Sequence, residues 1–280
     1  MALWFFLVGA GAAGADLSSL ADPVARVERE LDARVGVLVR EVGGGQSWSH
    51  RAGERFLMNS TAKVLICAAV LDAAAANELD LGEALPVRPA DLIAHAPLTE
   101  KRVGGFVSID EACAAAIDLS DNTAANLLLE RLGGPAAVTA FLRRSGDLTT
   151  RLDRTEPALN EWAVGDVRDT TTPEAMLASL ETILLGEALR IDARLQLREW
   201  MSTGTYTGPL VRAAAPEDWV IADKSGAGAV TRSYVALITP PGRASWLVGI
   251  FLSEAQADLA VRSTALASIT SAVVGALQAR

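Results

Sequence analysis

Two side chains that could form a nucleophile and its base lie close together in the first third of this 280-residue chain. Ser60 and Lys63 begin an apolar stretch that predicts a helix to about residue 76. Because positions i and i+3 of a helix are neighbours, the hydroxyl and the amine can meet. Serine attacks only after a base takes its proton, and lysine can be that base only when neutral, which burial favours. Taken alone, the S-x-x-K pattern also fits an ordinary helix start.

Two further motifs carry groups that could bind a substrate or move protons. Ser120 and Asn122 belong to an S-D-N run at the end of a predicted helix. There a second hydroxyl could pass a proton to a leaving group, and an amide could hydrogen-bond a carbonyl. Lys224, Ser225 and Gly226 follow a predicted edge strand and suit an anion and a closely approaching backbone. Each motif by itself also fits ordinary turn or strand-end chemistry.

The rarity of lysine sets two of these motifs apart. The chain has 22 arginines but only three lysines, of which Lys63 and Lys224 fall in the motifs. Arginine keeps its proton in a protein, whereas lysine can lose it. We therefore interpret Lys63 as a residue whose type serves proton transfer rather than charge alone.

A fourth group of candidate residues lies between positions 145 and 171, where no helical or strand period is visible. Glu156 could be a general base, and Asn160 could hold the water that it activates. Arg154 could pair with Asp169 and close this loop on itself. A polar surface loop with incidental charges is the alternative.

The elements that would position these residues are strands at the two ends of the chain and helices in the middle. Alternating apolar residues predict a strand at 34–42, and β-rich runs separated by Gly and Pro predict strands at 219–223, 234–239 and 246–252. Helices are predicted from residue 22, after residue 60, from a capping box at 108–111, and over 121–144, 172–200 and 254–279. We expect an α+β fold, with an antiparallel sheet built from both chain ends, flanking helices and an inserted all-helical lobe.

Composition argues against several classes of function. The formal net charge is −9 and no basic block is present, which argues against nucleic-acid binding. The two histidines, His50 and His95, are far apart, and neither a CxxC nor an HExxH motif occurs. We therefore expect no metal and no cofactor.

The first residues have the pattern of a secretory signal. A short apolar run, too short to span a bilayer, ends in an A-x-A site at residue 15, although no Lys or Arg precedes it. A frayed N-terminal extension is the alternative. We expect a signal peptide at 1–15, export to the periplasm or the medium, and no membrane attachment after cleavage.

The combined motifs resemble those of the class A serine β-lactamases. S-x-x-K, S-D-N and K-[ST]-G form that family's signature, and residues 145–160 and 165–173 resemble its omega loop. The likeness covers about 22–280. It implies a monomer that hydrolyses the β-lactam amide of penicillin-type antibiotics and so confers resistance. It also implies one domain at 16–280, with a sheet lobe at about 22–60 and 205–280 and a helical lobe at about 61–204.

The resemblance also implies how the reacting groups divide the work. Ser60 is the nucleophile, and its activation is shared between Lys63 and Glu156. The backbone N–H groups of Ser60 and Ala227 form an oxyanion hole. Ser120 relays a proton to the ring nitrogen of the substrate.

Other residues are implied to guide the water and hold the substrate. Asn160 helps Glu156 to direct the water that hydrolyses the acyl-enzyme. The remaining contacts are Asn122 with the amide side chain of the substrate, and Lys224, Ser225, Gly226 and Arg232 with its carboxylate end.

Two departures from the family pattern affect the edge of the site. His95 stands where the family often has an aromatic residue at the lip. The segment before Arg232 is one residue shorter than in common members, so Arg212 is an alternative carboxylate-binding cation.

Cys67 and Cys113 match the positions of a disulfide found in part of the family, which export would permit. Two buried free thiols are the alternative.

Two other functions share part of the signature. Penicillin-binding peptidases carry the first three motifs but lack a water-activating glutamate, so their acyl-enzyme persists. A β-lactam sensor would need a membrane-spanning signalling segment, which the sequence does not show. The presence of Glu156 and Asn160 favours the hydrolase.

Overall fold

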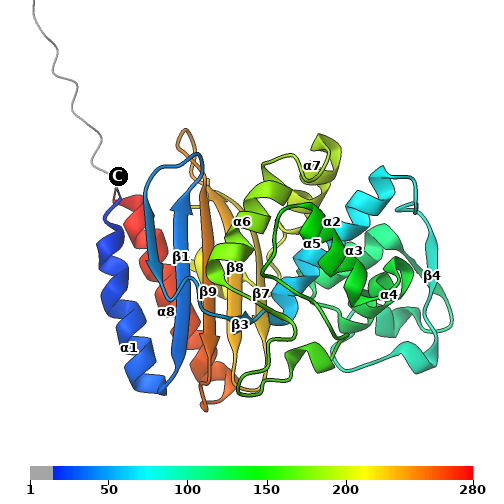
Figure 1. The fold of residues 1–280 in the computed structure, drawn as a ribbon, viewed down its shortest axis with the longest axis horizontal. Helices are drawn as coiled ribbons and strands as arrows, with labels where there is room; N and C mark the ends of the chain where they lie inside the picture. Colours follow the sequence, from blue (N-terminus) through cyan, green and yellow to red (C-terminus); the bar gives the residue numbers. More distant parts are fainter. Residues whose placement is uncertain (1–14, 280) are drawn as a thin grey trace, which may run out of the picture.

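The computed structural model describes residues 15–279, in which a sheet-based part and a helix-based part lie side by side (Figure 1). The predicted signal peptide lies outside the described residues, except for Ala15. The backbone N–H of Ala15 donates a hydrogen bond of 2.9 Å to Oε1 of Gln46. The leader therefore stays a prediction.

Five antiparallel strands form the main sheet, in the order β2-β1-β9-β8-β7. Strands from the two ends of the chain meet in its middle, where β1 pairs with β9 over its whole length. This confirms the predicted α+β architecture and places β7 at the edge of the sheet. The strands are β1 (Arg34–Glu41), β2 (Ser47–His50), β7 (Val220–Ala227), β8 (Arg232–Thr239) and β9 (Trp246–Ser253).

Helices α1 (Ala21–Leu31) and α8 (Leu259–Gln278) cover one face of this sheet (Figure 1). Side chains alternate between the faces of a strand, so Val35, Val37 and Val39 all bury on the side of these helices. By length and composition alone α8 could cross a membrane, but it packs along the sheet with many of its residues buried.

The other face of the sheet meets the helical part. Alternate residues such as Leu38, Leu247 and Phe251 join a second apolar cluster with α6 (Pro173–Leu184) and α2 (Ala62–Ala75). Helix α2 is the centre of this part, and its first ten residues are all buried. An apolar helix of this kind is expected where other helices surround it.

Local sequence signals explain where the surrounding helices begin and end. The predicted capping box at Ser108 and Glu111 opens α3, with both of its reciprocal hydrogen bonds present. Gly133 and Gly134 both have positive φ and separate α4 from α5, so the predicted helix at 121–144 is two helices. These helices are α3 (Ile109–Asp118), α4 (Asn122–Leu132), α5 (Pro135–Arg144) and α7 (Ile191–Trp200).

Short elements connect the larger ones. Two small sheets pair β3 (Phe56–Leu57) with β6 (Thr170–Thr171) and β4 (Ala84–Pro86) with β5 (Phe106–Ser108). The β3–β6 pair holds the end of the 145–171 loop beside the chain that enters α2. Single helical turns are η1 (Leu17–Leu20), η2 (Asn59–Thr61), η3 (Pro89–Asp91), η4 (Thr99–Arg102), η5 (Ala158–Asn160) and η6 (Gly208–Arg212).

Candidate active site

The predicted nucleophile lies where the two parts of the molecule meet. Ser60 is in η2, the turn that leads into α2, and this turn packs against the edge strand β7. Lys63 follows one turn later and is fully buried. The serine therefore faces the junction, while the lysine is enclosed behind it.

Lys63 Nζ is surrounded by oxygen atoms from four other residues. Its distances are 3.3 Å to Ser60 Oγ, 2.7 Å to the backbone oxygen of Ser120, 2.6 Å to Asn122 Oδ1 and 3.1 Å to Glu156 Oε1. Burial lowers the pKa of Lys63, and the negative charge of Glu156 works against that shift. The lowered pKa makes the neutral amine more accessible than in an exposed lysine.

Ser120 occupies the junction between α3 and α4, in a left-handed conformation with φ 54°. The next residue, Asp121, is buried and accepts hydrogen bonds from the backbone N–H groups of Leu98, Thr99 and Ala124. Asp121 thus holds the start of α4 next to the start of the η4 turn at Leu98 and Thr99. Sequence reasoning gave this carboxylate no role, because two of its partners, Leu98 and Thr99, lie more than twenty residues away.

The second buried lysine also contacts Ser120. Lys224 Nζ donates to Ser120 Oγ at 3.1 Å and to the backbone oxygen of Ser225 at 2.8 Å. Burial, aided by the nearby charge of Lys63, lowers the pKa of Lys224 to about 7. The Ser120 hydroxyl therefore lies between two amines, since Lys63 Nζ is 3.4 Å away.

Gly226 allows the edge strand to run directly beside the nucleophile. A Cβ atom at this position would lie 2.8 Å from the backbone nitrogen of Ser60 and equally close to Asn59 Cβ. Real Cβ atoms do not approach so closely, so only glycine fits without a shift. Ala227 follows as the last residue of β7 and lines the same cavity as Ser60.

A cavity of about 400 Å³ opens over these residues. At its edge, His95 has φ 64°, and its ring centre lies 5.5 Å from that of Tyr206. The lip therefore carries an aromatic ring that was not predicted, contributed by a distant segment. The predicted residues that line the cavity are Ser60, His95, Ser120, Asn122, Asn160, Ser225, Gly226, Ala227 and Arg232.

Arg232 is the arginine that lines this cavity among the described residues. Its guanidinium donates to the backbone oxygen of Gly226 at 2.9 Å, and burial lowers its pKa to about 10. The alternative cation, Arg212, is held elsewhere by Asp223 at 2.9 Å and by the backbone oxygen of Ile221 at 2.8 Å. The structure thus leaves Arg232 as the candidate.

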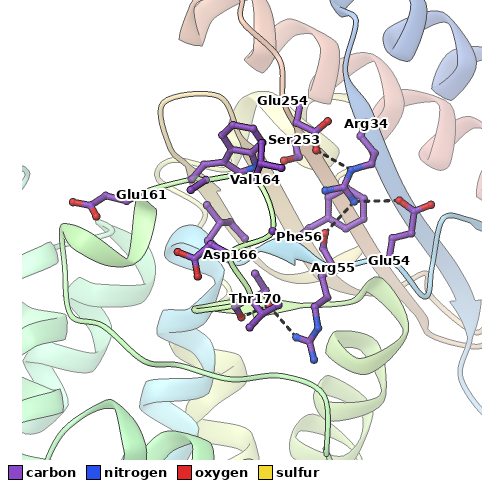
Figure 2. Close-up of a pocket in the computed structure, with 15 residues that line it drawn as sticks. Arg34, Glu54, Arg55, Phe56, Glu161, Val164, Asp166, Thr170, Ser253 and Glu254 are labelled. Carbon is purple, nitrogen blue, oxygen red and sulfur yellow. Dashed lines mark hydrogen bonds and ion pairs between the residues drawn. The ribbon is translucent and has the colours of Figure 1, made fainter.

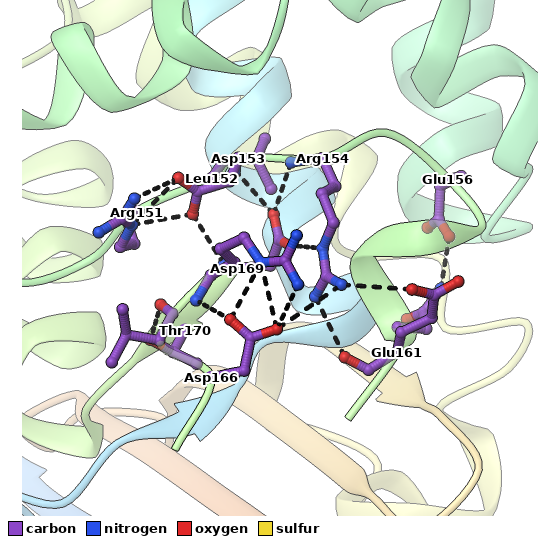
Figure 3. Close-up of polar contacts among 12 residues, drawn as sticks. Arg151, Leu152, Asp153, Arg154, Glu156, Glu161, Asp166, Asp169 and Thr170 are labelled. Atoms are coloured by element: carbon purple, nitrogen blue, oxygen red, sulfur yellow. Dashed lines mark hydrogen bonds and ion pairs between the residues drawn. The ribbon is translucent and has the colours of Figure 1, made fainter. Parts of the chain in front are cut away.

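The loop between α5 and β6 is closed by an internal ion pair, as the sequence suggested. Arg154 Nε lies 2.5 Å from Asp169 Oδ2, and the same aspartate accepts hydrogen bonds from the backbone N–H groups of Asp153 and Arg154. Figure 3 shows Arg154 among Asp169, Asp166 and Glu161. Asp169 is fully buried, so the charge pair holds the loop from within.

This loop presents Glu156 to Lys63. The Asn126 side chain bonds both backbone groups of Glu156, accepting from N–H at 2.9 Å and donating to C=O at 2.8 Å. Asn160 Nδ2 donates to Glu156 Oε2 at 2.5 Å. The peptide bond between Glu156 and Pro157 is cis. The carboxylate is therefore positioned from the backbone and from the side chain, and is itself buried.

A second cavity, also of about 400 Å³, lies against the loop from the side of the sheet (Figure 2). Arg34 lies within it and bonds Glu54 and Glu254, while Arg55 bonds Thr170. None of the predicted site residues lines it. No cluster of three potential metal-binding side chains occurs in the part of the chain that the structure describes.

The two cysteines are neighbours, on α2 and α3. Both are buried free thiols in the structure, and Cys67 Sγ lies 3.8 Å from the backbone oxygen of Cys113. Burial, with Cys67 nearby, raises the pKa of the Cys113 thiol well above its usual value. The predicted disulfide is absent from the structure and stays a prediction for the exported protein.

Several residues of the site were missed by sequence reasoning. Asn59 and Thr231 contact each other through their side chains, and Asn126 holds Glu156. No short motif marks them, because their partners come from other elements. A partly buried asparagine flanked by apolar residues, as at Asn126, is the one signal that the sequence could have offered.

The chain is similar to known β-lactamases over almost its whole length. Residues 19–277 match the family model described as the beta-lactamase enzyme family. A beta-lactamase of Rhodobacter capsulatus is 51% identical over 99% of this chain and 95% of its own length. Beta-lactamase AER-1 of Aeromonas hydrophila is 43% identical over 91% of this chain and 84% of its own length.

Solved structures agree with the sequence relatives. A beta lactamase from Xanthomonas campestris superposes with a TM-score of 0.89 and 43% identity, covering 92% of this chain and 97% of that one. An ancestral Gram-negative class A β-lactamase gives a TM-score of 0.88 and 46% identity, covering 92% of this chain and 99% of that one.

Proposed function

The chain belongs to the class A serine β-lactamases, which hydrolyse β-lactam antibiotics and so confer resistance, and from that premise we propose how its residues carry out the reaction. The substrate is a penicillin-type β-lactam. The reaction has two halves, in which Ser60 first takes the acyl group and water then removes it. The observation that carries the proposal is the buried Glu156 carboxylate, 3.1 Å from Lys63 and bonded to Asn160.

In the first half, Ser60 Oγ bonds to the carbonyl carbon of the lactam ring. Its proton passes to neutral Lys63, which touches the hydroxyl directly, and Glu156 shares the activation by taking that proton in turn. The developing oxyanion accepts hydrogen bonds from the backbone N–H groups of Ser60 and Ala227. Gly226 supports this role because it lets β7 run next to the helix start.

The ring then opens as the carbon–nitrogen bond breaks. The leaving nitrogen takes a proton from Ser120, which contacts both Lys63 and Lys224. Lys63 then reprotonates Ser120 with the proton that Glu156 returns to it, so that Glu156 can again accept a proton. The lowered pKa of each lysine supports such a relay, because each amine loses its proton more easily than an exposed lysine does.

In the second half, water attacks the ester carbon and gives its proton to Glu156, which passes a proton through Lys63 to Ser60 as the serine oxygen leaves the carbon. Asn160 holds the carboxylate and the water together. Glu156 is the group that distinguishes this enzyme from a peptidase, since without it the ester would persist.

The substrate is held at both ends. Ser225 and Arg232 bind its carboxylate, with the charge of Lys224 close by. Asn122 hydrogen-bonds its amide side chain, although its Oδ1 also contacts Lys63. His95, beside Tyr206, forms the outer edge. We also propose one monomeric domain at 16–280, divided as predicted into a sheet lobe and a helical lobe, and exported after loss of residues 1–15.

Glu156→Ala tests the proposal. Loss of the general base should slow deacylation by roughly 10²- to 10⁴-fold, whereas acylation through Lys63 continues more slowly. Intact-mass spectrometry should then find a long-lived penicilloyl adduct on the variant and none on the wild type after many turnovers. Ser60→Ala is the control and should take no label. A wild type that stalls after one equivalent of benzylpenicillin would favour the peptidase or the sensor.

A further inference from the structure

Asn59, the residue before the nucleophile, has an unusual conformation for a buried side chain. It is fully buried and its φ is 49°, in the left-handed region that asparagine and glycine tolerate best. This backbone turns the Asn59 side chain toward two other elements of the site. Sequence reasoning assigned it nothing.

The Asn59 amide joins three elements by two hydrogen bonds. Its Nδ2 donates to Asn160 Oδ1 at 3.0 Å, and its Oδ1 accepts from Thr231 Oγ1 at 2.9 Å. Thr231 is buried in the turn between β7 and β8, and Asn160 ends the η5 turn beside Glu156. The start of α2, the loop and the sheet edge are therefore tied at one side chain.

The direction of this chain of hydrogen bonds is set by Glu156. An ionised carboxylate only accepts, so Asn160 must present its Nδ2 to Glu156 Oε2. Its Oδ1 then faces the other way and requires a donor. Among the described residues, Asn59 is the one side chain that donates to this atom. The hydroxyl of Thr231 in turn donates a hydrogen bond to Oδ1 of Asn59, so both polar atoms of that amide have a partner.

We propose that Asn59 is a positioning residue for deacylation. It holds the Asn160 amide in the one orientation that donates to Glu156, and so orders the group that activates water. This inference rests on the proposed role of Glu156 and Asn160. It predicts that a residue in contact with neither substrate nor water controls the second half-reaction selectively.

Asn59→Gly is the direct test, because glycine adopts the same backbone and the substitution removes only the Asn59 side chain, with its hydrogen bonds to Asn160 and Thr231. Losing the hydrogen bond from Asn59 to Asn160 should change the equilibrium between orientations of the Asn160 amide by about a factor of ten. Stopped-flow measurements with benzylpenicillin should show deacylation slowed about tenfold, with acylation within twofold of the wild type. Accumulated acyl-enzyme in the steady state would be the second readout. Equal loss in both half-reactions would show a merely structural role.

A double-mutant cycle separates positioning from local strain. Asn160→Ala removes the group that Asn59 orients, so adding Asn59→Gly should then slow deacylation no further. Undiminished slowing by Asn59→Gly in that background would overturn the proposal.

Thr231 offers a matched pair that leaves Asn59 intact. Thr231→Val deletes the hydroxyl and should slow deacylation in the same direction but less, whereas Thr231→Ser keeps the hydroxyl and should not. Wild-type deacylation in both Asn59→Gly and Thr231→Val would refute the inference while leaving the accumulation in Glu156→Ala unaffected. Absence of that accumulation would instead refute the proposed function.

Discussion

At the scale of single residues, the site is built from two buried lysines and the oxygen atoms that surround them. The two lysines that the sequence singled out are both fully enclosed and both contact Ser120. Arginine in either place would keep its proton and could not take part in a relay. Residue type alone therefore predicted these positions, and burial supplies the pKa shifts that composition could not reveal.

Arg232 gives the prediction that belongs to this scale. Arg232→Ala should raise KM for penicillins and lower kcat/KM by roughly 10- to 150-fold, because a charged contact is worth about 1.5–3 kcal/mol. Steady-state kinetics with benzylpenicillin measures the effect. Arg212→Ala is the control, since its ion pair with Asp223 ties it to folding, and it should reduce thermal stability more than substrate binding. An unchanged KM in Arg232→Ala would exclude the assignment.

At the scale of elements, local rules predicted most helices and the long strands. The capping box marked α3, the start at residue 22 marked α1, and alternation marked β1, whereas the stretch predicted as helical over 172–200 is the two helices α6 and α7. Strand β2 was missed because four residues on an edge carry little pattern, and β7 extends through Lys224 to Ala227 only because β8 pairs with it there. The strand residues that were not predicted are those whose conformation depends on pairing with a neighbouring strand rather than on their own β-propensity.

The 145–171 loop is the element on which deacylation depends most. Asp169→Asn removes the buried partner of Arg154, and breaking such a pair costs about 3–5 kcal/mol. We expect a lower melting temperature and slower deacylation, because the loop carries Glu156. Thermal unfolding and burst kinetics measure the two effects. Asp192→Asn, which weakens an exposed pair with Arg190 outside the loop, is the control and should change neither much.

At the scale of the whole molecule, the site exists because three distant segments meet at one junction. The η2 turn and the start of α2 supply Ser60 and Lys63, the 145–171 loop supplies Glu156, and β7 closes the edge. The order of motifs in the sequence identified the family and hence this assembly. The tie through Asn59 was not predictable, because it depends on how the two parts face each other across the junction.

The predicted disulfide tests how the central helices are held together after export. Cys67 and Cys113 lie next to each other on α2 and α3, so oxidation would link the helix that follows Ser60 to the helix that precedes Ser120. Closing a chain segment of this length stabilises a protein by about 4 kcal/mol in the chain-entropy model. Both thiols are buried, and the raised pKa of Cys113 makes it slow to react while folded, so the titration requires denatured, unreduced protein. Exported protein should then show no free thiol, and the Cys67→Ala and Cys113→Ala double variant should melt at a lower temperature. Two titratable thiols in exported protein would refute the bridge and leave the pair as ordinary core residues.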